Sequence, residues 1–199
     1  MLTTSAAERS AVVSDYETDW WNTCANTLQE EQKQLIYAAR MGLVAQWGVG
    51  HPPVFDLEGR SVIDIGGGPV SLLLKCGNRG RAVVADPAEW PVWVLGRYEA
   101  EGIEFWRMPG EVITGYTLDE AWIYNVLQHV SDPSLVIARA RELASTIRIF
   151  EWIDIPPYPG HPHMLTQKGL EGWLGAPGFA TQINESGASG RAFYGVFST

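Results

Sequence analysis

Short apolar runs alternate along the chain with segments whose apolar residues recur at helical spacing. The run 61–65 is apolar and is followed by glycines, which is typical of a buried strand. Leu28, Leu35, Ile36 and Leu43 recur as one face of an amphipathic helix does. The same patterns predict strands over 61–65, 81–86, 102–106, 120–130 and 146–153, helices over 27–47, 88–100, 132–144 and 166–174, a helix beginning at 70, and a final hairpin over 179–184 and 191–197.

This alternation of strands and helices predicts an α/β fold with a doubly wound sheet. We expect a single domain over 1–199, in which 1–50 forms an N-terminal helical cap or lid and 60–199 forms the core. Thr27 and Glu30 have the spacing of a capping box, which predicts that the cap helix begins at Thr27. Residues 48–59 contain two prolines and are expected to form the connecting loop.

A glycine-rich turn follows the first predicted core strand, in the sequence Asp64-Ile65-Gly66-Gly67-Gly68. Glycines let a backbone approach a ligand closely, and a turn that opens a helix points free N–H groups at that ligand. Asp86 ends the next predicted strand, 22 residues after Asp64 (86 − 64), which is the place where a carboxylate binds ribose hydroxyls. A dinucleotide fingerprint needs a third glycine where Ser71 stands, so the turn indicates a nucleotide-type ligand other than NAD.

Two motifs, the glycine-rich turn and a later run that begins at Asn125, stand in the order found in the class I S-adenosylmethionine-dependent methyltransferases and resemble that family. The acid and glycines of the turn are similar to motif I of that family, Asp-x-Gly-x-Gly. The run from Asn125 to Pro133 is similar to the family's pattern Asn-x-Leu-x-His-x-x-Asp-Pro after the fourth strand. The resemblance covers roughly residues 60–155 and implies a Rossmann-like seven-stranded sheet with one antiparallel strand, and S-adenosylmethionine as the cofactor.

The resemblance also implies roles for individual residues in binding the cofactor. Asp64 would orient the turn and the methionine amino group, and the turn would pass beside the methionine portion. Asp86, followed by Pro87, would hold the ribose hydroxyls. Glu111 and Val112 match the position that caps adenine, and Asn125 would lie beside the methionine or the methyl group. The whole predicted set is Asp64, Gly66, Gly67, Gly68, Asp86, Pro87, Glu111, Val112 and Asn125. The open alternatives are a purely structural turn, a helix cap at Asp86 and a solvated acid at Glu111.

Three histidines are candidates for the catalytic base, because histidine titrates nearest neutrality. His129 follows the strand that carries Asn125, at the carboxyl edge where doubly wound folds bind ligands. His161 and His163 flank a proline in the loop after the fifth strand. The alternatives are a histidine that only caps a turn and histidines on a surface loop. The chain has no spacing signature of a metal site, so we expect no metal.

Composition and charge limit the class of partner. The net charge of −9 argues against a nucleic-acid backbone as the main partner, since such binding needs clustered Lys and Arg. Two cysteines far apart are expected to be free thiols, and the first twenty residues lack the apolar core of a signal peptide. Without an apolar run long enough to span a membrane, we expect a cytoplasmic protein of unknown oligomeric state.

These observations predict an enzyme that moves a methyl group to a hydroxyl or amine of a small molecule. The alternatives are a methyltransferase acting on nucleic acid or protein with a partner, and a non-catalytic S-adenosylmethionine-binding module. The tetrad Ile155-Pro156-Pro157-Tyr158 resembles the Asn/Asp-Pro-Pro-Tyr motif of amino-methyltransferases. Ile155 lacks the gripping amide or acid, however, and the tetrad follows the fifth strand instead of the fourth.

Overall fold

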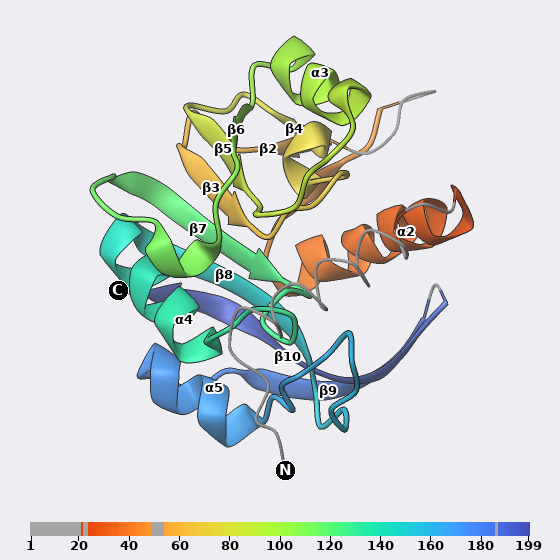
Figure 1. Ribbon diagram of the computed structural model, residues 1–199, viewed down its shortest axis with the longest axis vertical. Coiled ribbons are helices and arrows are strands. Elements are labelled where there is room, and N and C mark those ends of the chain that lie inside the picture. Colours follow the sequence, from red (N-terminus) through yellow and green to blue (C-terminus); the bar gives the residue numbers. More distant parts are fainter. Residues whose placement is uncertain (1–20, 22–23, 49–53, 186) are drawn as a thin grey trace.

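A seven-stranded sheet forms the centre of the computed structural model, which describes residues 21, 24–48, 54–185 and 187–199 (Figure 1). Its strand order is β6-β5-β3-β7-β8-β10-β9, in which β10 runs antiparallel to both of its neighbours and the other pairs are parallel. The strands are β3 (Val62–Ile65), β5 (Ala82–Ala85), β6 (Glu104–Trp106), β7 (Leu118–Tyr124), β8 (Ala144–Ile153), β9 (Phe179–Glu185) and β10 (Ala188–Ser198). The predicted doubly wound sheet of seven strands is therefore confirmed.

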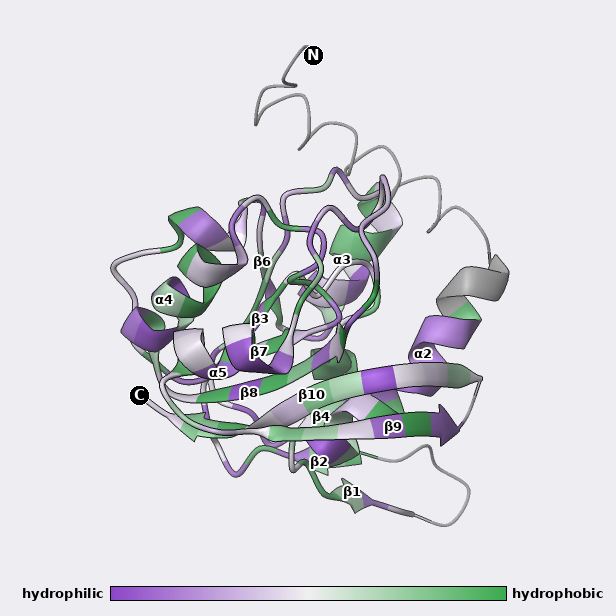
Figure 2. Cartoon of the chain, turned by 90° about the horizontal axis from the view of Figure 1, so that it is seen from below, coloured by the Kyte–Doolittle hydropathy of each residue, from purple (hydrophilic) through white to green (hydrophobic). Residues whose placement is uncertain are grey.

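Helices cover both faces of this sheet. The α-helices of the described residues are α2 (Cys24–Arg40), α3 (Val92–Ala100), α4 (Pro133–Leu143) and α5 (Gln167–Leu174). Residues of α2 and α3 share one buried apolar cluster with one face of the sheet, whereas α4 and α5 pack into the cluster on the other face. Figure 2 accordingly shows α2 and α4 on opposite sides of the strands. None of the helices in the described ranges has the length and apolar character needed to span a membrane.

Local signals in the sequence set several helix ends as predicted. Asp132 is the N-cap of α4, where its carboxylate accepts a hydrogen bond from the N–H of Leu135 at 3.1 Å, and Pro133 opens the helix. Thr166 caps α5 in the same way, and Gly175 ends that helix with a φ of +74°. The start of α4 and both ends of α5 thus follow from residues that lie within a few positions of them in the sequence.

The cap helix differs from its prediction at both ends. Thr27 lies inside α2, so the predicted capping box is wrong. The helix ends at Arg40 instead of reaching Trp47, because Gly42 takes a left-handed φ of +75° and the chain turns there. Residues 1–20 of the predicted cap lie outside the described residues.

The helix predicted to begin at Val70 is also absent. Only a short 3-10 turn, η1 (Leu72–Lys75), follows the glycines, and the chain then enters β4 (Cys76–Gly77). Strand β4 pairs with β2 (Val54–Asp56), which pairs with β1 (Ala45–Gln46), so part of the predicted connecting loop is a small sheet. Asn78 has a φ of +46° beside Gly77, a backbone conformation that does not continue a helix. A second 3-10 turn, η2 (Gly110–Val112), follows β6.

Candidate functional site

The glycine turn lies at the carboxyl edge of the sheet, between the ends of β5 and β7. Gly66 and Gly68 have φ angles of +76° and +58°, which only glycine adopts at low cost. A Cβ at Gly66 would overlap the Val126 side chain, and one at Gly67 would lie 2.6 Å from a carboxylate oxygen of Asp64. Among the described residues, a Cβ at Gly68 would meet only Trp21, at 3.8 Å. Other groups of the protein thus pack closely against Gly66 and Gly67, whereas the space beside Gly68 is comparatively open among the described residues.

Asp64 lies directly beneath this turn and is fully buried. Its Oδ2 accepts hydrogen bonds from the hydroxyls of Ser71 and Tyr124, each at 2.5 Å. Burial raises the pKa of Asp64 to about 7, although the two hydrogen bonds oppose this shift. The geometry fits the predicted role of Asp64 in orienting the turn. Its other oxygen is buried and has no hydrogen-bond partner among the described residues, and the predicted role toward the methionine amino group stays a prediction.

Two tyrosines, which sequence reasoning missed, hold the backbone of the turn. The Tyr98 hydroxyl of α3 donates to the Gly68 carbonyl at 2.6 Å and accepts from the N–H of Ser71 at 2.9 Å. The Tyr124 hydroxyl of β7 accepts from the N–H of Leu72 at 2.9 Å. The first N–H groups of a helix have no hydrogen-bond partner within the helix, and here the two hydroxyls accept from such groups at Ser71 and Leu72. No local sequence signal marks them, because they lie 27 and 52 residues from their partners.

Asp86 joins the turn to the segment after β5. One oxygen accepts from the N–H of Gly68 at 3.1 Å, and the other accepts from the N–H of Ala88 and the indole of Trp90. Helix α3 begins only at Val92 with Pro91 as its N-cap, so Asp86 is not the cap of that helix. Pro87 is exposed beside it. The structure therefore places Asp86 against the glycine turn, as the predicted ribose contact requires.

Glu111 and Val112 lie in η2, which follows β6 along the chain. One oxygen of Glu111 accepts from the N–H groups of Ser131 and Asp132 at 2.8 and 3.2 Å, just before α4. The other oxygen is buried and has no hydrogen-bond partner among the described residues. Glu111 is thus tied to the protein through one oxygen, which excludes the freely solvated acid, and the second oxygen can accept a donor from a ligand. Val112 is 59% exposed.

Asn125 ends β7 in a left-handed conformation with a φ of +53°. Its side-chain amide lies 3.4 Å from a carboxylate oxygen of Glu30 in α2, so a residue of the cap helix reaches the edge of the sheet. The next residues are held by Glu151 of β8, whose Oε1 accepts from the N–H groups of Val126 and Leu127 at 3.0 Å each. Burial raises the pKa of Glu151 to about 7. No local sequence signal marks either of these acidic contacts, because they join residues 95 and about 25 positions apart.

The three predicted histidines come together beside this segment. The Nδ1 of His129 donates to the Gly160 carbonyl at 2.7 Å, and its ring meets the His161 ring edge-on with centroids 4.4 Å apart. The Nε2 of His163 donates to the Val130 carbonyl at 2.8 Å. The loop after β8 therefore packs against the residues that follow β7. Since Nδ1 of His129 carries a proton, its neutral ring has the lone pair at Nε2.

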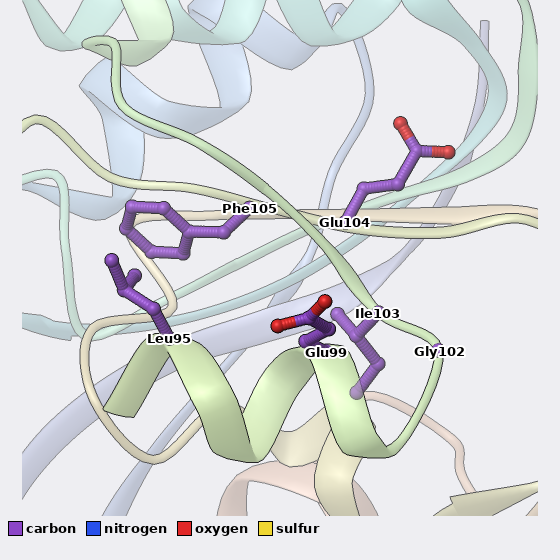
Figure 3. Close-up of a pocket in the computed structure, with 6 residues that line it drawn as sticks. All are labelled: Leu95, Glu99, Gly102, Ile103, Glu104 and Phe105. Atoms are coloured by element: carbon purple, nitrogen blue, oxygen red, sulfur yellow. The ribbon is translucent and has the colours of Figure 1, made fainter. Parts of the chain in front are cut away.

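A shallow depression elsewhere on the surface contains none of the predicted site residues. It lies between α3 and β6 and is lined by Leu95, Glu99, Gly102, Ile103, Glu104 and Phe105 (Figure 3). In the part of the chain described, no group of three or more His, Cys, Asp or Glu side chains is placed to hold a metal ion.

Solved structures with this architecture include several methyltransferases. The chain superimposes with a TM-score of 0.67 on the 1,6-didemethyltoxoflavin-N1-methyltransferase of Burkholderia thailandensis, at 17% identity over 100% of this chain and 92% of that one. It superimposes with a TM-score of 0.64 on the magnesium protoporphyrin IX methyltransferase of Synechocystis PCC 6803, at 15% identity over 95% and 99% of the two chains. The fold is that of the class I methyltransferases. No family model matches the sequence, and neither does any curated protein.

Proposed function

We propose that the chain is an S-adenosylmethionine-dependent methyltransferase that moves a methyl group to a hydroxyl or amine of a small molecule. The observation that carries this proposal is the convergence of the Gly66–Gly68 turn, Asp86 and Asn125 at the carboxyl edge of the sheet, in the order that the family resemblance requires. Ligands of doubly wound folds bind at this edge.

The residues present fit S-adenosylmethionine. The comparatively open face of the turn at Gly68 leaves room beside the backbone. The buried, unpartnered oxygen of Glu111 matches the exocyclic amine that adenine presents as a donor. Asp86, next to Gly68, has a carboxylate suited to ribose hydroxyls. The cofactor supplies an electrophilic methyl group on a sulfonium when it is bound.

The protein's own contribution to such a transfer is mainly positioning. A displacement reaction needs its two reactants aligned, and a site made from strand ends aligns them better than a loose surface does. Many acceptors must also lose a proton, for which we propose His129, His161 or His163. The role of proton acceptor is best supported for His129, because its hydrogen bond to the Gly160 carbonyl fixes the tautomer that has the lone pair at Nε2.

A small-molecule acceptor is supported by the charge of −9, which disfavours nucleic acid. It is also supported by the two structural neighbours, which act on a toxoflavin precursor and on a magnesium porphyrin. We propose a cytoplasmic location as well. The buried free thiol of Cys76, whose pKa is raised to about 12 by burial, is consistent with a reducing compartment.

Isothermal titration calorimetry tests the cofactor assignment directly. The purified protein should bind S-adenosylhomocysteine and S-adenosylmethionine and should not bind NAD. Incubation with methyl-labelled S-adenosylmethionine and a library of small hydroxyl and amine compounds then tests transfer. NAD binding with no response to S-adenosylhomocysteine would refute the cofactor. Cofactor binding with no transfer to any compound would favour the non-catalytic module or a macromolecular acceptor.

A further inference from the structure

Helix α2 places two buried polar side chains against the edge of the sheet, one helical turn apart. Gln34 is 2% exposed, and its side-chain amide donates to the carbonyl of Val70, just after the glycine turn. Glu30 is 5% exposed, and its Oε1 faces the side-chain amide of Asn125 at 3.4 Å. Residues four apart lie on the same face of a helix. The helix face that carries Glu30 and Gln34 therefore lies against both the residue after the glycine turn and the end of β7.

The hydrogen bonds that this carboxylate makes are long. Its second oxygen lies 3.5 Å from the Lys33 ammonium, and the contact with Asn125 is at 3.4 Å. Both distances are at the outer limit for a hydrogen bond. A buried carboxylate is favourable only when a cation or several short hydrogen bonds compensate for its lost hydration. Burial, and after it the Glu30 carboxylate, hold the pKa of Tyr37 well above its ordinary value, so the Tyr37 hydroxyl also lies beside this carboxylate.

The two carboxylates that lie against the glycine turn, Asp64 and Asp86, both bond to it or to its neighbours, Asp64 through one oxygen only. Asp64 is 0% exposed and lies beneath Gly67, where even a Cβ would be 2.6 Å from its oxygen. Asp86 accepts from Gly68 and from the residues after β5. A cationic group on the open side of the turn therefore meets Glu30 before it meets Asp64.

We infer that Glu30 binds the α-ammonium group of the methionine portion of S-adenosylmethionine. The inference rests on the proposed function, in which the methionine portion passes the glycine turn and Asn125, and the helix face that carries Glu30 lies against both. An ammonium supplies three N–H donors and a charge, so it replaces long contacts of a buried carboxylate with short charge-assisted hydrogen bonds. The cap helix is then part of the cofactor site as well as a cover for it.

The test compares two ligands that differ in the amino-acid portion. S-adenosylhomocysteine carries the ammonium, whereas 5′-methylthioadenosine keeps the nucleoside and the sulfur without it. Titration of the Glu30→Gln variant should show S-adenosylhomocysteine binding weakened by roughly tenfold to a hundredfold, the range for a lost charge-assisted hydrogen bond. Its affinity for 5′-methylthioadenosine should equal that of the unaltered protein. The unaltered protein should also lose S-adenosylhomocysteine affinity as the pH rises through the pKa of the ligand's amino group, and the variant should not.

Glu31→Gln is the matched control, because Glu31 is the next residue of α2 and points to Arg97 at 3.9 Å with a third of its side chain exposed. It should bind both ligands normally. Unchanged S-adenosylhomocysteine affinity in Glu30→Gln would overturn the inference and leave the proposed function standing. Equal weakening of both ligands would also overturn it, since that result means a distorted site. If the unaltered protein binds no S-adenosylhomocysteine, the proposed function itself fails.

Discussion

Two fully buried carboxyl groups should make the stability of this protein depend on pH near neutrality. Asp64 supports the glycine turn and Glu151 supports the turn after β7, and burial raises the pKa of each to about 7. A group whose pKa is raised on folding stabilises the protein below that pKa, and the stabilisation is lost as the pH rises through it. We therefore expect the free energy of unfolding to fall between pH 6 and pH 8.

The size of the fall follows from the proton occupancy of the two states. In the unfolded chain both carboxyls are ionised throughout this interval, at their ordinary pKa values. In the folded protein each goes from mostly protonated to mostly ionised, which removes about 1 kcal/mol per group over the two pH units. The two groups together account for roughly 2–3 kcal/mol.

Urea denaturation at a series of pH values measures this directly. Asp64→Asn and Glu151→Gln should each reduce the fall by about 1 kcal/mol relative to the unaltered protein, whatever their effect on absolute stability. Glu99→Gln, at an exposed position of α3, should leave the slope unchanged. Asp64→Asn is the cleaner comparison, because Glu151 interacts electrostatically with His129. If Asp64→Asn keeps the full slope, Asp64 does not titrate near 7 and the argument from burial is wrong.

Three further perturbations test other parts of the structure. Asp86→Ala should weaken S-adenosylhomocysteine binding by about 1–3 kcal/mol in calorimetry, and an unchanged affinity in a folded variant would remove Asp86 from the site. Gly67→Ala should cost about 1–3 kcal/mol in urea denaturation, because its Cβ would lie 2.6 Å from the pinned oxygen of Asp64; full stability would mean that the turn can shift. Arg148→Met should destabilise the fold by about 3 kcal/mol by leaving Glu120 buried without its two-pronged partner, and Arg148→Met with Glu120→Leu should cost less.

Features that depend on neighbouring residues were predictable from the sequence. The strands of the seven-stranded sheet, the caps at Asp132 and Thr166, and the end of α5 at Gly175 each follow from a few adjacent residues, although the strand predicted over 120–130 ends at Tyr124 and β1, β2 and β4 were not predicted. The terminal hairpin and its place in the sheet also agree with the prediction. The placement of Asp86 beside the glycines follows from parallel strands that end at one edge, which is a property of the topology.

The parts that escaped prediction depend on distant residues. Tyr98 and Tyr124 were not among the predicted site residues, although their hydroxyls hold the backbone of the turn. Glu30 was read as a local cap, whereas its contact with Asn125 spans 95 residues. The prediction of a helix after the turn was wrong. The segment forms β4 and pairs with β2, and this tertiary pairing outweighs the helical pattern of the local sequence. The predicted roles of the site residues toward the cofactor remain predictions.

The tyrosine hydroxyls on the turn also bear on how the chain acquires its shape during synthesis. The glycines emerge from the ribosome well before the residues that fix them, since Tyr98 follows Ser71 by 27 positions and Tyr124 follows Leu72 by 52. Strand β3 lies between β5 and β7, so a nascent chain that ends before residue 118 leaves one edge of β3 unpaired and lacks the hydroxyl of Tyr124 that holds the turn. A cofactor in the cell therefore meets a competent site only after the middle of the sheet is complete, and it cannot assist the earlier steps.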